Sequence, residues 1–375
     1  MAGVARPRVC LPGARPDLGP EDQMIDCPVA IVDRADRLDP TRWDDLAGDR
    51  PFADHRWLRL AEAVLVGHEP RYVVVERGGQ YAAAAVCALG RRLQNPALQR
   101  RVGWLLHMAP HLRCEIPIAF QPGLFLRPGE HADALLAEIG RLAARERALF
   151  VRIDHLRPDA GGWDALSSAG YKPFPMWDEA TLDLGCGSLD AYLARLPSRK
   201  RGELNAVRRR ADAAGLVVAP HTPSAASAPL LRRLVGQVLG RHAALEQYRG
   251  DLFARAAGVL GGDLLVLTAE RDGRIVATAS LLRSGDDVAA KWLGLDYALT
   301  WNTPTYPRLM LACVEHAIAM GARRLHLGAT AHETKRHFGV VFEPRAGAIS
   351  ARLPLLTRLA GRALAGGVGA TAATA

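Results

Sequence analysis

Lysine is rare in this sequence, and its four lysines are therefore the first residues to consider for chemistry. Of 48 cationic residues, 44 are arginine, and the lysines are Lys172, Lys200, Lys291 and Lys335. Such a skew is typical of a GC-rich coding sequence, in which arginine is the default cation. A lysine ammonium can lose its proton or contact one developing oxyanion, whereas an arginine guanidinium stays charged. Lys291 and Lys335 are the main candidates, with a surface role as the alternative for each.

Polar residues also follow two predicted strands in the last third of the chain. Asp296 comes directly after one strand, and His332 and Glu333 come after the next. Ligands of open α/β sheets gather at the carboxyl ends of strands, where such side chains can exchange protons. We interpret His332 as the best candidate for a general base, and a helix-start residue is the alternative. Four aromatic residues could line an acyl or sugar pocket or belong to the core: Trp292, Tyr297, Trp301 and Tyr306.

The densest cluster of charge lies between the two halves of the chain, at residues 199–210. It holds six cations within twelve residues. A helix is predicted here with Ser198 as its N-cap, and Arg201 and Arg208 fall on one stripe of that helix. We expect this stripe and Arg199 to bind a phosphate-bearing ligand, which could be a nucleotide, coenzyme A or an RNA backbone. The alternative is a helix face that is only solvated.

These residues belong to an α/β unit that is predicted to occur twice. The first copy opens with a hairpin at Gly78-Gly79 and the second with one at Asp272-Gly273, since both dipeptides suit two-residue turns. The later elements match in order: helix 132–146, strand 149–154, helix 161–169 and strand 171–175, then helix 305–320, strand 323–329, helix 331–338 and strand 340–344. Each strand–helix–strand crossover predicts a parallel pair of strands. A chance likeness of two ordinary α/β segments is the alternative.

Length and composition agree with two globular domains. The 375 residues exceed what one core usually supports, and 49% are apolar and 23% charged. The six cysteines are scattered, so we predict neither zinc nor disulfides. No apolar run reaches the roughly 18 residues that span a bilayer, and residues 1–23 lack the apolar region of a secretory signal. We therefore expect a cytoplasmic protein.

Three segments resemble sequences of Fem-type proteins, which are tandem GNAT-fold peptidoglycan aminoacyltransferases with many acetyltransferase-like relatives. Residues 51–58 resemble the entry to their first domain, and residues 192–201 resemble the opening of their second. Residues 327–339 resemble their closing glycine–lysine–phenylalanine–glycine signature. The resemblance covers residues 25–355, and the order of the three segments is its most specific feature.

This resemblance implies a mixed α/β fold with two GNAT-like domains. The expected division is a disordered extension at 1–24, domains at 25–184 and 185–355, and a tail at 356–375. The implied activity is transfer of an acyl or acetyl group from an activated donor to an amine of a small molecule or of a cell-envelope precursor. Lys335 matches the lysine of the family, where it would stabilise negative charge on the donor phosphate or on the carbonyl oxygen.

The candidate site residues follow from these arguments. The catalytic candidates are Lys335, His332 and Asp296. The candidates for binding substrate or phosphate are Arg199, Arg201, Arg208, Lys291, Tyr297 and Arg336.

Two departures from the family leave the donor open. Thr334 stands where relatives often have an aromatic residue before the lysine. The glycine-rich loop by which GNAT enzymes hold the coenzyme A pyrophosphate is absent from both matching connections, 121–130 and 297–307, where prolines remove donors. Acyl-CoA is the suspected donor, aminoacyl-tRNA is the alternative, and no metal is expected. The other function class is a non-catalytic module that binds RNA or another anion, although RNA-recognition motifs are lacking. The sequence does not predict an oligomeric state.

Overall fold

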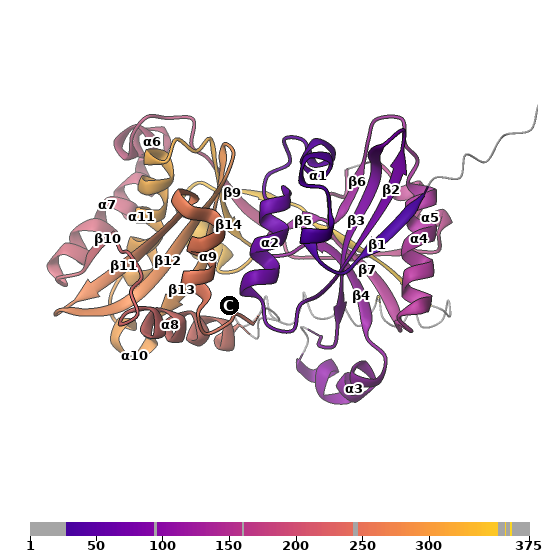
Figure 1. Cartoon of the computed structure of the whole chain (residues 1–375). Helices are drawn as coiled ribbons and strands as arrows, with labels where there is room; N and C mark the ends of the chain where they lie inside the picture. The colour runs from indigo at the N-terminus through magenta and orange to yellow at the C-terminus, as the bar shows by residue number, and fades with distance from the viewer. Residues whose placement is uncertain are drawn as a thin grey trace, which may run out of the picture.

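A computed structural model of the chain describes residues 28–93, 96–159, 161–242 and 247–351, together with Thr357 and Gly361. The described strands form two separate mixed sheets, which stand side by side with helices between them and on their outer faces (Figure 1). The fold class predicted from the sequence is thereby confirmed. The predicted extension at 1–24 lies outside the described residues, as does the tail at 356–375 apart from Thr357 and Gly361.

The first sheet is built around the hairpin of β2 and β3. Gly78 and Gly79 both have positive φ, as the two-residue turn requires. Helix α4 carries the chain from the middle of this sheet to β7, which pairs with β4 in parallel. The elements in chain order are β1 (Val29–Val32), α1 (Pro40–Ala47), α2 (His55–Val64), β2 (Glu69–Arg77), β3 (Gln80–Gly90), α3 (Pro96–Met108), β4 (His111–Ile116), β5 (Gln121–Pro122), β6 (Leu124–Leu126), α4 (Ala132–Arg145), β7 (Phe150–Leu156), α5 (Trp163–Ser168) and β8 (Lys172–Pro175).

The second sheet repeats this order. β11 and β12 form its hairpin, β13 is the third antiparallel strand, and α11 leads to β14, which pairs with β13 in parallel. The elements that follow β8 in chain order are β9 (Glu179–Asp183), α6 (Leu189–Arg195), α7 (Ser198–Ala213), β10 (Val217–Pro220), α8 (Ala228–Arg241), α9 (Leu252–Leu260), β11 (Leu264–Arg271), β12 (Arg274–Ser284), β13 (Asp287–Leu295), α10 (Tyr297–Thr300), α11 (Thr305–Ala319), β14 (Arg324–Gly328), α12 (His332–Arg336), β15 (Val341–Glu343) and, in the first sheet, β16 (Ala346–Ala351).

The predicted repeat is therefore present, with element limits close to those expected. One local prediction was wrong. Ser198 is the first residue of α7 and not its cap, because Pro197 occupies the cap position and no side chain accepts a hydrogen bond there. Proline fixes the extended entry into the helix without a side-chain acceptor.

The two sheets exchange one strand each. β16, at the carboxyl end of the described chain, lies in the first sheet between β7 and β8 and is antiparallel to both. β9 follows β8 in sequence but lies in the second sheet between β14 and β15. Each sheet is thus completed by a segment that adjoins the other sheet along the chain. The domain limits of 25–184 and 185–355 stay a prediction.

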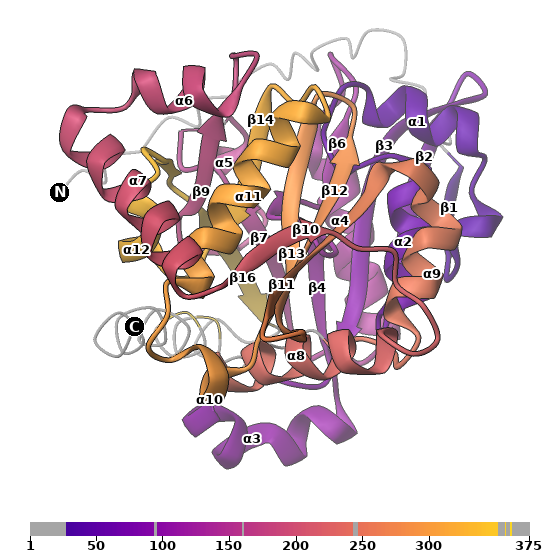
Figure 2. The ribbon, with the colours of Figure 1, turned by 90° about the vertical axis from the view of Figure 1, so that its left-hand side faces the viewer.

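Three buried clusters of apolar side chains hold these layers together. The cluster between the sheets joins α1, α2, α8 and α9 to both, with Trp43, Trp57, Phe253 and Trp292 among its large members. A second cluster lies between the second sheet and its outer helices α7 and α11, and a third lies between the first sheet and α4 (Figure 2). Burial of these faces is the main favourable term in folding.

Gly294 shows how closely α8 packs on β13. A Cβ atom at this position would lie 2.6 Å from the backbone carbon of Leu234 and from the backbone nitrogen of Val235, both in α8. Backbone atoms of a packed helix cannot move aside as the end of a side chain can. The glycine thus sets the distance between this helix and the strand.

Gly294→Ala is expected to lower the free energy of unfolding by about 1–3 kcal/mol, because the added methyl group overpacks the contact. Gly258→Ala is the matched control, since Gly258 lies in α9 with no heavy atom within 4 Å of an added Cβ. That change should raise stability by about 0.5–1 kcal/mol through helix propensity. Urea unfolding of the three proteins measures both effects, and equal stability of the two variants would contradict the packing argument.

Candidate active site

The central parallel pair of the second sheet separates toward its carboxyl ends. β13 and β14 share three aligned pairs, Asp287 with Arg324, Val288 with Leu325 and Ala289 with His326. Beyond them the described residues of β13 pair with β12 alone, and those of β14 pair with β9. Parallel strands that acquire different partners leave room for a ligand at their carboxyl ends, which is where open α/β sheets bind ligands.

Lys335 lies at this point and is almost wholly buried, with 2% of its surface exposed. Its Nζ donates hydrogen bonds to the backbone oxygens of Leu327, at 2.7 Å, and of Gly328, at 3.1 Å, at the end of β14. Burial, helped by the cation of Lys291, lowers the pKa of Lys335 to about 7, although Glu179 opposes the shift. The amine can therefore change its charge near neutral pH.

The first unit contributes Phe120 to the same place. The Nζ of Lys291, on β13, lies 4.2 Å from the centre of the Phe120 ring. A Cβ atom on Gly328 would approach that ring to 3.0 Å, and Gly328 has φ +75°. On its other side Phe120 meets the ring of His155 edge-on, with centres 5.2 Å apart. Phe120 thus packs between the two units beside both lysines.

The end of α8 is also close to Lys335. Burial, followed by the cations of Arg241 and Lys335, lowers the pKa of His242, so that this imidazole favours its neutral form. The guanidinium of Arg241 lies 4.5 Å from the centre of the Tyr297 ring, at the start of α10. No spacing or motif marks Phe120, Arg241 or His242 in the sequence. Only the packing of α8 and of residues 117–120 brings them here.

The other catalytic candidates have structural partners. The Asp296 carboxylate accepts hydrogen bonds from the backbone N–H groups of Ala298, at 3.1 Å, and Leu299, at 3.3 Å, and so caps α10. The Nε2 atom of His332 lies 3.1 Å from the Asp178 backbone oxygen. Burial, followed by Lys335, lowers the pKa of His332 and favours the neutral imidazole.

Arg336 lies on the same helix as His332 and packs beside it. Its guanidinium is 5.7 Å from the centre of the Phe342 ring, and the His332 ring is 4.7 Å from that ring. α12 thus directs Lys335 into the protein, whereas Arg336 is exposed.

The predicted basic stripe lies on α7 and takes part in surface ion pairs. Arg199 pairs with Glu203 at 3.0 Å, and Arg208 lies 3.9 Å from the Asp190 carboxylate. Arg201 donates to the Ala194 backbone oxygen at 3.5 Å. Such exposed pairs add little to stability. Glu203 also binds His337 directly after α12, which connects α7 to the helix that carries Lys335.

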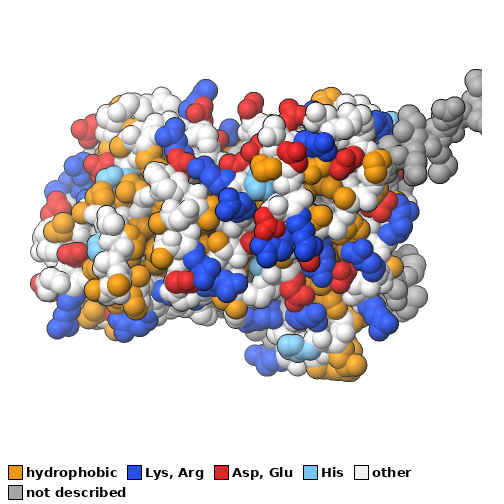
Figure 3. Space-filling view, viewed as in Figure 1, with side chains coloured by type: hydrophobic (Ala, Val, Ile, Leu, Met, Phe, Trp, Pro, Cys, Tyr) orange, Lys and Arg blue, Asp and Glu red, His pale blue; other side chains and the backbone are white. Residues whose placement is uncertain are grey.

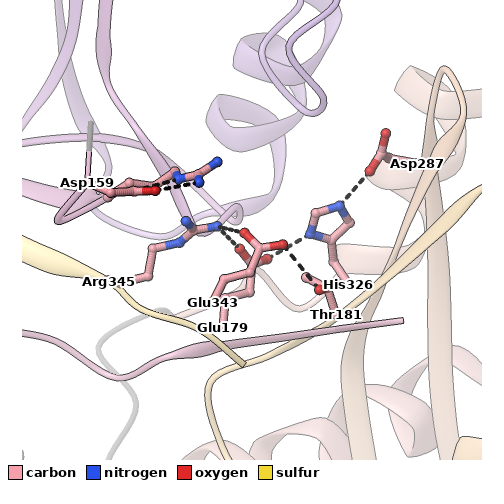
Figure 4. Close-up of polar contacts among 8 residues, drawn as sticks. Asp159, Glu179, Thr181, Asp287, His326, Glu343 and Arg345 are labelled. Carbon is pink, nitrogen blue, oxygen red and sulfur yellow. Dashed lines mark hydrogen bonds and ion pairs between the residues drawn. The ribbon is translucent and has the colours of Figure 1, made fainter. Parts of the chain in front are cut away.

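A buried charged network lies behind the site, where the exchanged strands meet (Figure 4). His326 on β14 lies between two carboxylates, with Nδ1 2.8 Å from Glu179 and Nε2 2.7 Å from Asp287. Burial disfavours the imidazolium, but these two hydrogen bonds outweigh it and raise the pKa of His326. Arg345, just before β16, binds Glu179 at 2.5 Å and Glu343 at 3.0 Å. The network thereby links β9, β14 and β15 to the start of β16.

A cavity of about 530 Å³ lies far from these residues, on the outer face of the first sheet between α4 and the end of β16. Its walls consist largely of alanine, leucine and backbone, with Asp133 and Tyr171 as its ionisable members, and we assign it no chemistry. Within the described residues no group of histidine, cysteine, aspartate and glutamate side chains is suited to hold a metal ion. None of the described helices has the length and apolar character needed to cross a bilayer.

Comparison with known proteins gives the same picture of the fold. Residues 198–336 match the family described as acetyltransferase (GNAT) domain. The crystal structure of FemX superposes with a TM-score of 0.60 at 13% identity, over 86% of this chain and 98% of that one. A tandem GNAT protein from the clavulanic acid biosynthesis pathway gives 0.57 at 14% identity, over 86% and 98%. L-PGS from Bacillus licheniformis gives 0.54 at 14% identity, over 87% and 96%. No match was found among curated proteins.

The lowered pKa of Lys335 makes the stability of the protein depend on pH. Its pKa is about 7 in the folded protein, against 10.5 for an ordinary lysine, so the unfolded chain binds more protons between these values. The free energy of unfolding must then rise as the pH rises through this window. Lys335→Met removes this titration, and wild type should gain stability relative to Lys335→Met as the pH rises from about 7 to about 10.5.

Urea unfolding of both proteins at several pH values measures the difference. Lys172→Met serves as the control, because Lys172 is exposed on β8, and its stability should follow that of wild type throughout. Parallel pH profiles for wild type and Lys335→Met would show that Lys335 titrates as an ordinary lysine.

Proposed function

Because the chain has the tandem GNAT fold of Fem-type proteins, we propose that it is an N-acyltransferase. Its residues 198–336 match the acetyltransferase (GNAT) domain. It would transfer an acyl or acetyl group from an activated donor to an amine of a small molecule or of a cell-envelope precursor. The observation that carries the proposal is the burial of Lys335 where β13 and β14 separate.

Lys335 is suited to stabilise the transition state. A lysine ammonium has three hydrogens to donate, and two of them are engaged by the backbone oxygens of Leu327 and Gly328. Those bonds hold Nζ in place, so the third hydrogen has a fixed direction. A fixed donor in a water-poor site is worth much more than one in solution, because it needs no reorganisation when charge develops.

The reaction that fits is direct transfer. The acceptor amine forms a bond to the acyl carbon, and negative charge develops on the carbonyl oxygen, to which Lys335 donates. The bond between the acyl carbon and the sulfur or oxygen of the leaving group then breaks, and the proton of the amine passes to a base or to that leaving group. His332 and His242 can serve as the base, because the pKa of each is lowered and each is near Lys335.

Acyl-CoA is the proposed donor, and residues at the start of α11 fit its phosphates. Thr305 and Tyr306 lie in the first turn, where backbone N–H groups have no partner within the helix. The Nε atom of Arg308, in the same turn, is buried and has no hydrogen-bond partner among the described residues. Pro304 and Pro307 reduce the number of N–H donors, so Arg308 and Arg241 would replace part of the usual loop. Coenzyme A, when bound, supplies the acyl group as a thioester.

Replacement of Lys335 tests the proposed role. Lys335→Ala should lower kcat on the order of 10²-fold and change KM little, because the lost interaction forms in the transition state. Lys335→Arg should not restore turnover, since a planar guanidinium cannot take the place of a compact ammonium between two carbonyls. Lys172→Ala is the matched control and should retain wild-type turnover. A thermal-shift screen with acyl-CoAs and nucleotide sugars identifies the substrates, and release of free thiol measures the rate. Wild-type turnover by Lys335→Ala would move the site elsewhere.

Aminoacyl-tRNA is the alternative donor, and the exposed cations of α7 favour it. Arg199 is 90% exposed in its side chain, and Arg209 and Arg210 are exposed as well. A row of exposed cations can contact successive phosphates of a nucleic acid. The same row would serve a non-catalytic RNA-binding protein.

Charge reversal on α7 separates these possibilities. Arg201→Glu with Arg208→Glu should weaken binding of charged tRNA by at least tenfold and reduce its dependence on salt, while acyl-CoA binding stays unchanged. Filter binding at several salt concentrations measures the first effect, and thermal shift measures the second. Unchanged tRNA binding would show that the stripe is only solvated. Tight tRNA binding without any acyl transfer would favour the non-catalytic module.

A further inference from the structure

Large apolar side chains are exposed at one end of the molecule. On α3, Trp104 is 62% exposed, Met108 79% and Leu105 36%. At α10, Leu299 is 41% and Trp301 81% exposed. Figures 1 and 2 both place α3 and α10 at the lower end of the molecule, and in Figure 1 α3 lies below the first sheet and α10 below the second. We call these five side chains the α3–α10 surface.

The fold does not account for this exposure. α3 buries Leu106, which is 1% exposed, while Trp104, Leu105 and Met108 face away from the protein. Single exposed apolar residues are ordinary, but five large ones at one end, two of them tryptophan, indicate a surface that binds something.

The charge around the α3–α10 surface is mainly positive. The carboxylates at its edge are engaged, since Asp296 caps α10 and Glu69 pairs with Arg91. The sequence contains no aspartate or glutamate at residues 91–114 or at residues 297–314. Arg92, Arg100 and His107 are exposed beside the apolar side chains of α3, and Arg241 is exposed beside α10. Figure 3 shows the protruding α3 lobe with hydrophobic atoms next to basic and histidine side chains. An occupant of this surface must therefore be apolar and negatively charged at once.

We propose that the α3–α10 surface docks on an anionic phospholipid bilayer. Tryptophan, leucine and methionine can enter the boundary between headgroups and acyl chains, while arginines remain at the level of the lipid phosphates. Anionic lipids attract such cations when they lie near the membrane surface. A second copy of the chain is a poorer occupant, because a two-fold contact would bring the same uncompensated cations together.

The α3–α10 surface lies close to the candidate active site. α10 begins directly after β13 and is capped by Asp296, so the surface adjoins the end of the sheet where β13 and β14 separate. A bilayer bound there would lie next to the residues around Lys335. The docking itself does not depend on the proposed acyl transfer, and either can fail without the other.

Vesicle flotation with the full chain tests the docking. The protein should float with vesicles that contain phosphatidylglycerol, and not with pure phosphatidylcholine vesicles, and added salt should weaken the binding. Trp104→Ala with Met108→Ala should reduce the bound fraction about tenfold, since both inserted side chains are lost. Arg100→Glu should weaken binding to the anionic vesicles.

Matched controls are available outside the α3–α10 surface. Val217 on β10 and Val341 on β15 are 63% and 61% exposed, and their replacement by alanine should leave vesicle binding unchanged. Circular dichroism confirms that each variant is folded. The proposal is overturned if no vesicle binds, if the Trp104 and Met108 variant binds as wild type does, or if light scattering shows a dimer that this variant abolishes.

Discussion

The exchange of β9 and β16 between the sheets is the constraint on which the rest of the structure depends. Buried charged hydrogen bonds from Glu179 to His326 and Arg345 hold β9 and the start of β16 in this arrangement. An unpaired buried charge destabilises the folded protein. Removal of one of these three side chains would therefore destabilise the protein by leaving the remaining buried charges unpaired. Because β9 pairs with β14, the same hydrogen bonds also fix β14, whose last two carbonyl groups accept hydrogen bonds from Lys335.

Lys335 and Lys291 illustrate how the two units share one site. The second unit supplies both lysines and the separated strands, and the first supplies the Phe120 ring that packs against Lys291 and Gly328. Burial and the neighbouring cation of Lys291 together lower the pKa of Lys335 to about 7. Composition alone could not predict this shift. The buried surface around Lys335 therefore sets the pKa of this lysine as well as holding the fold together.

The sequence predicted the repeated hairpins and crossovers well, because turn glycines and apolar periods are local signals. It could not predict the exchanged strands β9 and β16, since a local pattern can at most identify a strand and not its partner. Lys335 is a candidate from the sequence because lysine is rare in this chain and because residues 327–339 resemble the closing signature of Fem-type proteins. Asp296 follows a strand, as expected, yet its carboxylate is engaged as a helix cap. His242 and Phe120 have no local signal, because only tertiary packing places them.

The placement of β16 also sets the order in which the chain can be completed during synthesis. The first sheet needs residues 346–351 between β7 and β8, and these leave the ribosome only after the strands of the second sheet have been made. Domains commonly fold from the amino terminus as they emerge. Here the first sheet cannot be completed until β16 is made, and before then β7 and β8 have no strand between them. Until then the facing edges of β7 and β8 are open to pairing with other chains, so the first sheet stays incomplete for as long as the second unit takes to be made.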